Sequence, residues 1–590
     1  MEKTDIANPQ YFHKVVDCQY ACPAHTPVPE YIRKISQQDY TGAYMINWDS
    51  NVFPGILGRT CDRPCEPACR RTRTHEKAVA ICRLKRVASD YKDDITSLIP
   101  KTPKKKNGYK IGLIGGGPAS LAVARDLLLM GYECTIYEKD PKAGGLMRTN
   151  IPSFRLPESV LDEEVNYVLD MGVKRKFNSH ITSMKDFLTK DYDAVFVGTG
   201  APKGRDLFIE GREEAASNIQ IGIDFLTGIA FEHIDTIGKK VIVLGGGNTA
   251  MDCCRSSLRL GADDVKVIVR SPFSQMKASE WEIEDALEEN IPIYENHVPK
   301  KFVHKDGKLI GMEFEKVKAV FDKHGKRSLV PTGEKPVFFE CDDVLIAIGQ
   351  DNAFEWIEKD IGIEFGDWDM PVVNDVTFQC SLPKVFFGGD AAWGPENIIT
   401  AVAHAHQAAI SIDKFCHGQD LHDRPAPGVQ VFSQKMGIHE WSYDNNISQD
   451  LRYVVPKEDH SISLNDLKVE VEKGFDALDG FFEAQRCLNC DVQTIFTESL
   501  CIECDACMDI CPTDCISFIP DGPEEEIRKS LRIPALNLDQ DIYVSETLPT
   551  NRKLFKDEDV CLHCGLCAER CPTGAWDMQK YLYNEAKVYS

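Results

Sequence analysis

The placement of the cysteines constrains this sequence more than any other feature. The chain has 590 residues and 23 cysteines, of which six lie at positions 18–82 and eleven at positions 487–571. In a large protein of a reducing compartment, clustered cysteines indicate metal ligation or redox chemistry, because disulfides are rare there. We therefore expect metal-binding ends around a middle, residues 83–486, that holds only six cysteines.

Two cysteine runs near the C-terminus share the spacing Cys-x2-Cys-x2-Cys-x3-Cys-Pro. In this bacterial ferredoxin pattern, three cysteines of a run bind one [4Fe–4S] cluster and the fourth binds the other cluster. Zinc sites do not have this spacing. Cys515 falls outside the pattern, and we expect it to be a small packed residue. The predicted ligands are Cys501, Cys504, Cys507 and Cys571 for one cluster, and Cys561, Cys564, Cys567 and Cys511 for the other.

Residues 109–138 predict a strand, a glycine turn, a helix and a second strand that together bind a dinucleotide. The first glycine allows the tight turn, the second lets backbone amides approach a pyrophosphate, and the helix N-terminus favours negative charge there. An acidic residue at the end of the next strand accepts hydrogen bonds from ribose hydroxyls. The predicted contacts are Gly115, Gly117, Pro118, Ala119, Ser120 and Glu138.

A second unit of the same kind begins near residue 240, and such a repeat predicts two nucleotide-binding domains. Arg270 stands at the strand end where the first unit has Glu138. An arginine there suits a 2′-phosphate, which an acidic residue would oppose, so the sequence favours NADP(H) over NAD(H). The alternative is a solvated arginine without a ligand. The predicted contacts are Gly245, Gly247, Asn248, Thr249, Ala250 and Arg270.

Composition argues against other classes of function. Asp and Glu number 92 against 68 Lys and Arg, and the resulting net charge of −24 opposes binding to nucleic acids and to anionic membranes. No apolar stretch approaches the roughly 18 residues of a membrane span. The N-terminus lacks the basic and apolar regions of a secretory signal. We therefore expect a cytoplasmic protein.

The middle of the chain, from about 109 to 415, resembles the FAD- and NADPH-binding part of the glutamate synthase small subunit. The resemblance lies in GGLMRTNIPSFRLP at 144–157, VFVGTGAP at 195–202 and VFFGGDAAWGPENIITAVAHAHQAA at 385–409. It implies FAD at the first turn, with Asp390 on the ribityl chain and a helix N-terminus at Ile399 and Thr400 facing the pyrimidine ring. The family usually has paired arginines near 270, whereas here Ser271 follows Arg270. Further implied flavin contacts are Gly145, Leu146, Arg155, Gly200 and Gly389.

The N-terminal cysteines resemble the iron–sulfur domain that precedes the flavin domain in this family and that dihydropyrimidine dehydrogenase also carries. The resemblance lies in Cys18-x3-Cys22-Pro23, in GRTCDRPCEPACRR at 58–71 and in VAICRLKR at 79–86. It implies one [4Fe–4S] cluster on Cys22, Cys61, Cys65 and Cys82.

Six N-terminal cysteines cannot fill two clusters of four ligands, so Cys18 and Cys69 are left two ligands short. The CxxC pair that normally opens this domain is missing from the N-terminus, and a similar string, EAQRCLNC, stands at 483–490. The alternative is that this pair is idle and the N-terminus holds one cluster. We predict a fourth [4Fe–4S] cluster on Cys18, Cys69, Cys487 and Cys490.

Together these units predict an α/β protein with two Rossmann-like domains, for FAD and NAD(P)H, the second inserted in the first. A helical N-terminal iron–sulfur domain and a C-terminal α+β domain of the bacterial ferredoxin type flank them. Residues 93–108 are polar and basic, which is typical of a linker. The predicted domains are 1–107 (helical iron–sulfur), 108–236 with 375–420 (FAD), 237–374 (NAD(P)H), 421–485 (a wrapping linker) and 486–590 (two clusters).

These parts predict an NAD(P)H-dependent oxidoreductase in which FAD takes a hydride and the clusters carry single electrons. We see no Ser–His–Asp set or acid–base pair, and we expect His404 and His406 to pack or to contact the flavin. A flavin disulfide reductase would need a CxxC or CxxxxC pair facing the flavin, which residues 83–486 lack; the adjacent Cys253 and Cys254 should only pack.

Substrate chemistry is therefore expected on a partner, in a hetero-oligomer. The candidates are ferredoxin, a 2-oxoacid:ferredoxin oxidoreductase and, second, a glutamate synthase large subunit. Alternatives for the chain itself are a glutamate synthase small subunit and a subunit of a bifurcating NADH/ferredoxin:NADP oxidoreductase. The stretch 519–557, between the two cysteine runs, is a candidate docking surface.

Overall fold

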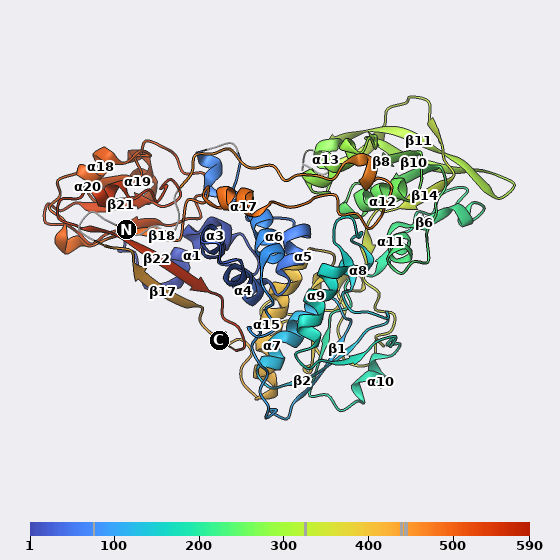
Figure 1. The fold of residues 1–590 in the computed structure, drawn as a ribbon, viewed down its shortest axis with the longest axis horizontal. Helices are drawn as coiled ribbons and strands as arrows, with labels where there is room; N and C mark the ends of the chain where they lie inside the picture. The colour runs from blue at the N-terminus through green and yellow to red at the C-terminus, as the bar shows by residue number, and fades with distance from the viewer. Residues whose placement is uncertain (75–76, 322, 324–326, 437–440, 442–446, 590) are drawn as a thin grey trace.

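The computed structural model describes residues 1–590 except 75–76, 322, 324–326, 437–440, 442–446 and 590. The α/β fold class is confirmed: two parallel sheets of five strands lie beside a helical N-terminal unit and a C-terminal unit with two small antiparallel sheets (Figure 1). Among the described residues, we find no helix that is both long and apolar enough to cross a membrane.

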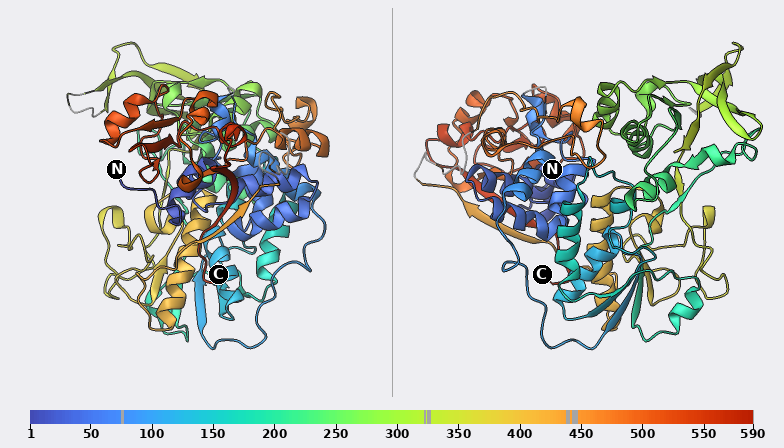
Figure 2. Two further views of the ribbon diagram at one scale, coloured as in Figure 1. Left: turned by 90° about the vertical axis from the view of Figure 1, so that its left-hand side faces the viewer. Right: turned by 45° about the vertical axis from the view of Figure 1, so that its right-hand side comes forward.

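The N-terminal unit is a bundle of short helices around a core that includes Tyr31, Tyr44 and Trp48. Proline at the first or second position starts three of these helices, where its missing N–H is not needed. The elements are α1 (Pro9–Val15), α2 (Asp17–Tyr20), α3 (Val28–Ser36), α4 (Tyr40–Asn51), α5 (Pro54–Thr60), η1 (Arg70–Arg73) and α6 (Ile81–Tyr91). In the right-hand view of Figure 2 this bundle (blue) lies between the C-terminal unit (red and orange) and the first nucleotide-binding unit.

The first sheet has five parallel strands in the order β16–β4–β1–β2–β3. Its central strands are buried almost throughout, as expected for a parallel sheet with helices on its faces. The strands are β1 (Lys110–Ile114), β2 (Glu133–Tyr137), β3 (Lys174–Lys176), β4 (Ala194–Val197) and β16 (Val385–Phe387). The helices α7 (Pro118–Leu129), α9 (Glu158–Leu169) and α15 (Ile398–Cys416) lie between this sheet and the N-terminal bundle (Figure 1). Three short helices complete this unit: α8 (Leu146–Thr149), α10 (Met184–Leu188) and α14 (Asp390–Trp393).

The second sheet has the order β6–β14–β7–β8–β9, and all its neighbours are parallel. The strands are β6 (Ile219–Ile221), β7 (Lys240–Leu244), β8 (Asp264–Ile268), β9 (Ile293–Tyr294) and β14 (Asp343–Ile346), and the helices are α11 (Gly222–Ala230), α12 (Asn248–Arg259) and α13 (Glu280–Glu288). Four antiparallel strands extend from this unit: β10 (His297–Lys305), β11 (Lys308–Phe321), β12 (Arg327–Pro331) and β13 (Val337–Glu340).

The sheet pairing places the unit boundaries differently from the sequence prediction. The chain crosses between units at the antiparallel pair of β5 (Lys203–Gly204) and β15 (Gln350–Asp351). Strand β6 therefore pairs in the second sheet, although it lies in the range 108–236 predicted for FAD. In the opposite sense, Phe354 and Ile357 belong to the first sheet's core, although 237–374 was predicted for NAD(P)H. The prediction erred because β6 is short and no glycine turn follows it.

The C-terminal unit contains the sheets β17–β22–β18 and β19–β21–β20. Its elements are α18 (Ala506–Ile510), α19 (Glu524–Ser530), α20 (Leu566–Arg570), β18 (Val492–Phe496), β19 (Ile516–Ile519), β20 (Ile542–Val544), β21 (Lys553–Asp557) and β22 (Trp576–Asn584). The strand β17 (Gly428–Ser433) comes from the segment predicted to wrap over other domains.

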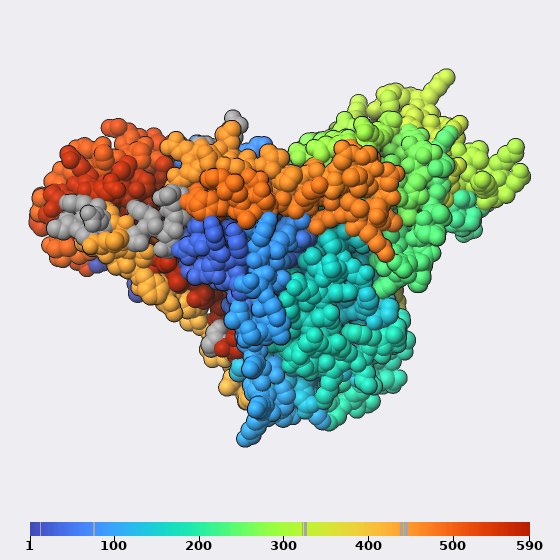
Figure 3. Space-filling model, viewed as in Figure 1, coloured from blue at the N-terminus to red at the C-terminus, as the bar shows by residue number. Residues whose placement is uncertain are grey.

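The described part of that segment does contact several units. The helix α17 (Ala477–Ala484) packs on α3 and α6, and Lys457 binds Asp285 of α13 with 2.6 Å between Nζ and Oδ1. Figure 3 shows this part of the chain (orange) running across one face from the C-terminal unit to the second nucleotide-binding unit.

Candidate flavin, nicotinamide and iron–sulfur sites

The first glycine turn is built to leave open space in front of a helix N-terminus. Gly115 has φ +96°, and a Cβ there would lie 2.5 Å from the carbonyl oxygen of Gly198, so only glycine fits. Gly117 precedes α7, and a Cβ there would have no neighbour closer than 3.9 Å. The space that a side chain would fill at Gly117 is where a pyrophosphate can meet the helix dipole.

Distant segments converge on this turn. A Cβ on Gly145 would lie 2.7 Å from Cα of Gly117, and one on Gly389 would lie 3.2 Å from Cβ of Ala119. Ser120 is buried close to Gly198. A Cβ on Gly198 would lie only 2.4 Å from Oγ of Ser120. Three further predicted contacts lie at these places: Pro118 opens α7, Leu146 opens α8, and Gly200 has φ +67° after β4.

Glu138 is placed to hold the turn. Its carboxylate accepts hydrogen bonds from the backbone N–H of Gly116 at 2.6 Å and of Asp140 at 3.0 Å. Burial raises the pKa of this carboxyl group. The residue therefore fixes the loop beside the place where an adenosine ribose would lie.

The closing segment supplies a carboxyl group and a second helix N-terminus. Asp390 accepts a hydrogen bond from the N–H of Glu396 at 3.0 Å, and burial raises its pKa to about 6. Asn397 caps α15 by accepting from the N–H of Thr400 at 2.9 Å. The start of α15 thus presents partial positive charge, which suits the anionic pyrimidine ring of a reduced flavin.

Three predicted residues of the first unit have other partners. Arg155 donates to both carboxylate oxygens of Asp252, at 2.7 and 2.8 Å, so it joins the first unit to α12 of the second. His406 lies between Asp126 and the carbonyl oxygen of Ser50, and it joins α7 to α4. His404 contacts aromatic rings, so both histidines pack as expected.

The second glycine turn has the same construction. Gly245 has φ +136°, and a Cβ there would lie 2.1 Å from the carbonyl oxygen of Ala347. A Cβ on Gly247 would have nothing within 4 Å. Asn248 accepts from the N–H of Ser279 at 2.9 Å, which folds the following loop toward the turn. Thr249 is half-buried and Ala250 is fully buried at the start of α12.

Strand register corrects the equivalence of Arg270 and Glu138. The N–H of Gly115 bonds to the carbonyl of Tyr137, and the N–H of Gly245 bonds to that of Ile268. The residue equivalent to Glu138 is therefore Val269. Arg270 is exposed and stands one position further along. The residue that would face the ribose 2′ group is therefore not acidic.

The first N-terminal cysteine group lies directly beside the helix that is predicted to face the flavin. Cys22, Cys61 and Cys82 are buried in one cluster together with Ile399 of α15. The thiols of Cys61 and Cys65 both lie within hydrogen-bonding reach of Cys82. Four buried thiols so close together suit a [4Fe–4S] cluster, because it takes them as thiolates. The structure thus brings together Cys22, Cys61, Cys65 and Cys82.

The second group joins the two ends of the chain. One cavity is lined by four cysteines and by Ile32, Arg70 and Val79. Burial raises the pKa of the Cys18 thiol, and the three neighbouring cysteines raise it further. The cysteines brought together here are Cys18, Cys69, Cys487 and Cys490.

Polar contacts hold the C-terminal segment against the N-terminal bundle at this point. Arg33 of α3 donates to a carboxylate oxygen of Asp491 at 2.7 Å, and both side chains are buried. Arg486 donates to the carbonyl oxygens of Lys77 and Ala78 at 2.9 and 3.0 Å. The CxxC pair is therefore fixed on both sides by contacts to the N-terminal unit.

The two ferredoxin-type runs form two further cavities. Cys515 lines the second of them, is buried, and has its sulfur 3.5 Å from that of Cys511. Short helices start after residues with positive φ, Asp505 and Gly565, which turn each run back on itself. The exchange of the fourth cysteine follows the predicted pattern: Cys501, Cys504, Cys507 and Cys571 line one cavity, and Cys511, Cys561, Cys564 and Cys567 line the other.

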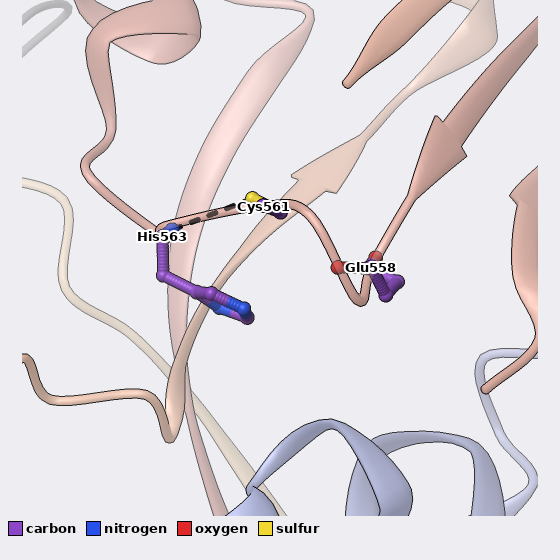
Figure 4. Close-up of side chains that lie close together, drawn as sticks. All are labelled: Glu558, Cys561 and His563. Carbon is purple, nitrogen blue, oxygen red and sulfur yellow. Dashed lines mark hydrogen bonds between the residues drawn. The ribbon is translucent and has the colours of Figure 1, made fainter. Parts of the chain in front are cut away.

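Glu558, Cys561 and His563 also lie close together (Figure 4). The backbone N–H of His563 donates to Sγ of Cys561 at 3.3 Å. The other two side chains already have partners: Glu558 accepts from Tyr11 at 2.9 Å and His563 Nε2 lies 3.1 Å from Arg70 Nη1. We therefore assign Cys561 to the ferredoxin-type group and not to a separate metal site.

Sequence reasoning missed two cations beside the cysteine groups. Burial lowers the pKa of Lys85, but the nearby thiols raise it above its usual value. Arg70 donates to the carbonyl oxygen of Cys561 at 2.7 Å. Both could have been suspected from position, since Lys85 follows Cys82 by three residues on one helix face and Arg70 follows Cys69 directly.

Comparison with known proteins finds the corresponding domains in this chain. Residues 109–409 match the pyridine nucleotide-disulphide oxidoreductase family, residues 12–96 match dihydropyrimidine dehydrogenase domain II with its 4Fe–4S cluster, and residues 500–575 match a 4Fe–4S dicluster domain. The resemblance seen in the sequence is thereby confirmed. FAD, NAD(P)H and 4Fe–4S clusters are the cofactors that these domains carry.

Three curated relatives align over two thirds or more of this chain. The chain is 33% identical to the NADP(+)-dependent formate dehydrogenase subunit beta of Moorella thermoacetica, over 80% of this chain and 70% of the relative. It is 31% identical to the NADPH-Fe(3+) oxidoreductase subunit beta of Geobacter sulfurreducens, over 82% and 77%. It is 30% identical to the glutamate synthase [NADPH] small chain of Escherichia coli, over 67% and 87%.

Among solved structures, FprA of Mycobacterium tuberculosis in complex with NADPH is 18% identical and aligns over 52% of this chain and 85% of its own, with a TM-score of 0.45.

The relatives named as beta subunits or small chains are parts of larger enzymes. The chain belongs to the pyridine nucleotide-disulphide oxidoreductase family, as an NAD(P)H-dependent flavin enzyme with 4Fe–4S domains at both ends.

Proposed function

We propose that this chain oxidises NADPH at the second glycine turn and conducts the electrons, through FAD at the first turn and four [4Fe–4S] clusters, to a catalytic partner. FAD supplies the conversion of a two-electron hydride into single electrons, which the clusters carry. The residues of the chain bind these groups and hold them in order. All three relatives described above are named for NADP(+) or NADPH, which supports NADP(H) as the nicotinamide.

The observation that carries this proposal is the burial of Ile399 in one hydrophobic cluster with three cysteines of the first group. Ile399 is 1% exposed and packs in one cluster with Cys22, Cys61 and Cys82. The helix start that would face the flavin and the nearest cysteine group therefore share an apolar wall. Such a wall excludes water between the two sites and keeps their separation fixed.

The other three cysteine groups follow in order from the first group toward the C-terminal unit. Tyr31 is fully buried between the two N-terminal groups, and thiols of both raise the pKa of its hydroxyl in addition to burial. Arg70 extends from the second group to the carbonyl oxygen of Cys561. Cys507 belongs to one ferredoxin-type group and Cys567 to the other, and Cys507 raises the pKa of the Cys567 thiol in addition to burial. The order supports conduction from the flavin to the C-terminal unit.

The partner is proposed to hold the substrate site and to dock on the C-terminal unit. Within the stretch 519–557, Leu536 and Leu538 are 81% and 68% exposed, which supports a role in docking. We keep a 2-oxoacid:ferredoxin oxidoreductase as the first candidate and a glutamate synthase large subunit as the second. We place the complex in the cytoplasm, because sixteen of the 23 cysteines are assigned to iron–sulfur clusters and a reducing compartment keeps such thiols from forming disulfides.

The alternative of a disulfide reductase finds no support at the only adjacent pair in the middle of the chain. Cys253 and Cys254 are fully buried on α12, and their thiols donate to the carbonyl oxygens of Gly222 and Met251. Both therefore pack, as the sequence predicts.

The test uses two matched glycine variants of the purified holoprotein, mixed with NADPH without oxygen. Gly247→Val places its side chain in the open space at the second turn, so NADPH should no longer bleach the flavin, while FAD stays bound. Gly117→Val fills the equivalent space at the first turn, so FAD itself should be lost. Flavin absorbance and FAD content measure both results.

Wild-type protein should also reduce a viologen dye with NADPH. If Gly247→Val still bleached the flavin at the wild-type rate, the assignment of the two turns would be wrong. If neither NADPH nor NADH reduced the wild-type flavin, the proposed function would be wrong.

A further inference from the structure

We propose that Arg327, on the hairpin strand β12, binds the 2′-phosphate of NADP(H) together with Arg270 and Ser271. The inference rests on the proposed function and identifies the residues that select the phosphorylated nicotinamide. The second guanidinium, absent at Ser271, would then come from a different element of the same unit.

The geometry brings the hairpin to the end of β8. Nη1 of Arg327 donates to Oγ of Ser271 at 3.2 Å, and Arg327 pairs with Phe321 across the hairpin. The N–H of Asn296 bonds to the carbonyl of Ser271 and holds that loop from the other side. In a strand–helix–strand nucleotide unit, the end of the second strand lies beside the adenosine ribose.

The following loop covers the phosphate turn. The backbone N–H groups of Lys277 and Ala278 both bond to the carbonyl of Gly246, at 2.9 Å. The loop from Arg270 to Ala278 therefore starts at the ribose end and returns to the pyrophosphate turn. A nucleotide bound at Gly247 would have its 2′ position beside the start of this loop.

The guanidinium of Arg327 lacks partners on the side away from Ser271. Its Nε and Nη2 are shielded from solvent, and within the described ranges neither has a hydrogen-bond acceptor. A shielded cationic donor without an acceptor is unfavourable, so its partner is expected to be an anion that binds there. Adjacent N–H groups of one guanidinium match two phosphate oxygens.

The neighbouring charges suit a phosphate. Val269 stands where the first unit has Glu138, so the ribose-facing position carries no negative charge, and Arg270 is exposed next to it. The nearby acid Glu295 accepts a hydrogen bond from the backbone N–H of Phe273 at 2.6 Å. An NAD(H) site would instead require an acceptor for the ribose 2′-hydroxyl.

The test compares 2′,5′-ADP with 5′-AMP by calorimetric titration of the holoprotein, since only the first carries the 2′-phosphate. Arg327→Gln should weaken 2′,5′-ADP at least tenfold and change 5′-AMP less than twofold. Arg327→Lys should recover part of the loss, because a single cation remains but not the fork of donors. Lys318→Gln, on the same hairpin and exposed, should leave both ligands unchanged.

Retained FAD content would verify that each variant is folded. Equal losses for both ligands would overturn the proposal and assign Arg327 a structural role. Unchanged binding of 2′,5′-ADP, with a loss only in Arg270→Gln, would overturn it as well. Neither outcome depends on flavin reduction by NADPH, so each is distinct from a failure of the proposed function.

Discussion

At the scale of single residues, buried carboxyl groups join the units of this chain. Glu164 of α9 is 1% exposed and accepts hydrogen bonds from the backbone N–H of Gly55 and Ile56, at 2.6 and 2.9 Å, and from the hydroxyl of Tyr44 at 2.7 Å. The first two contacts satisfy free N–H groups at the start of α5. Glu164 therefore fixes the N-terminal bundle on the first nucleotide-binding unit.

We predict a specific pH dependence for Glu164→Gln. Burial raises the pKa of Glu164 to about 7, from 4.5. The folded chain thus binds this proton more tightly than the unfolded chain. Below pH 4.5 the carboxyl group is protonated in both states, so it carries no penalty. As pH rises from 4.5 to 7, the unfolded chain loses the proton first, which lowers the free energy of unfolding of the wild type. The stability of the Gln variant relative to wild type should therefore increase by about 3 kcal/mol across this window.

Urea unfolding at a series of pH values, without oxygen, measures the difference. The opposite slope would mean that the three hydrogen bonds stabilise the carboxylate more than burial penalises it. Glu282→Gln is the control, because it changes a buried carboxyl group in a different network. It reports on effects that are not specific to the contact between Glu164 and α5.

Single residues also show what sequence can predict. The turns at Gly115 and Gly245 were predictable, because a steric requirement acts locally on one residue. Glu164 was not, because it is one of four acids in the helix sequence ESVLDEEVNYVL and only the tertiary contact to α5 distinguishes it. The register of Val269 likewise depends on which backbone groups pair.

At the scale of elements, α15 starts at the predicted flavin site and packs on α7. The signal for its start was visible in the sequence, since Asn397 precedes an apolar run and asparagine is a preferred N-cap. The strand β6 gave no comparable signal, because three residues show no period and their partner β14 lies more than 100 residues away along the chain.

The cap of α15 leads to a prediction about FAD binding. Asn397→Ala removes the acceptor for the N–H of Thr400, which should destabilise the helix start by about 1 kcal/mol. If that start binds the pyrimidine ring, FAD affinity should fall about fivefold. Asn397→Ser keeps a capping oxygen and is the matched control. Fluorescence titration of the apoprotein with FAD measures both, and equal affinities for Ala and Ser variants would contradict the role of the cap.

At the scale of the whole molecule, the cysteine group of Cys18, Cys69, Cys487 and Cys490 joins regions that are remote in sequence. Counting ligands predicted this group, because two cysteines at one end lacked partners and a pair at the other end was free. The contacts that hold it, such as Arg33 with Asp491, were beyond sequence reasoning, since many arginines and acids could pair. The unit boundaries near β6 and β15 were missed for a different reason, since β6 is short and no glycine turn follows it.

The joined ends give a countable prediction. Replacing Cys487 and Cys490 by Ser should lower the iron content by about four per chain, the same loss as Cys18→Ser, because one cluster holds four irons. The control, Cys253→Ser with Cys254→Ser, changes two buried thiols that pack on α12 and should keep all iron. Colorimetric iron analysis of protein purified without oxygen gives the number. Full iron in the Cys487 and Cys490 variant would show that this group binds no cluster.

Because both ends of the chain contribute cysteines to this group, the group can be completed only late in synthesis. Ribosomes add roughly 5–20 residues per second, so tens of seconds separate the appearance of Cys69 from that of Cys487. If both groups bind clusters as proposed, the group beside Ile399 needs only N-terminal cysteines and can receive its iron early, whereas Cys18 and Cys69 must stay reduced and vacant until the C-terminal segment docks. A chain released early would keep an incomplete site open to oxidation, so metal delivery to this position reports that synthesis has passed residue 490.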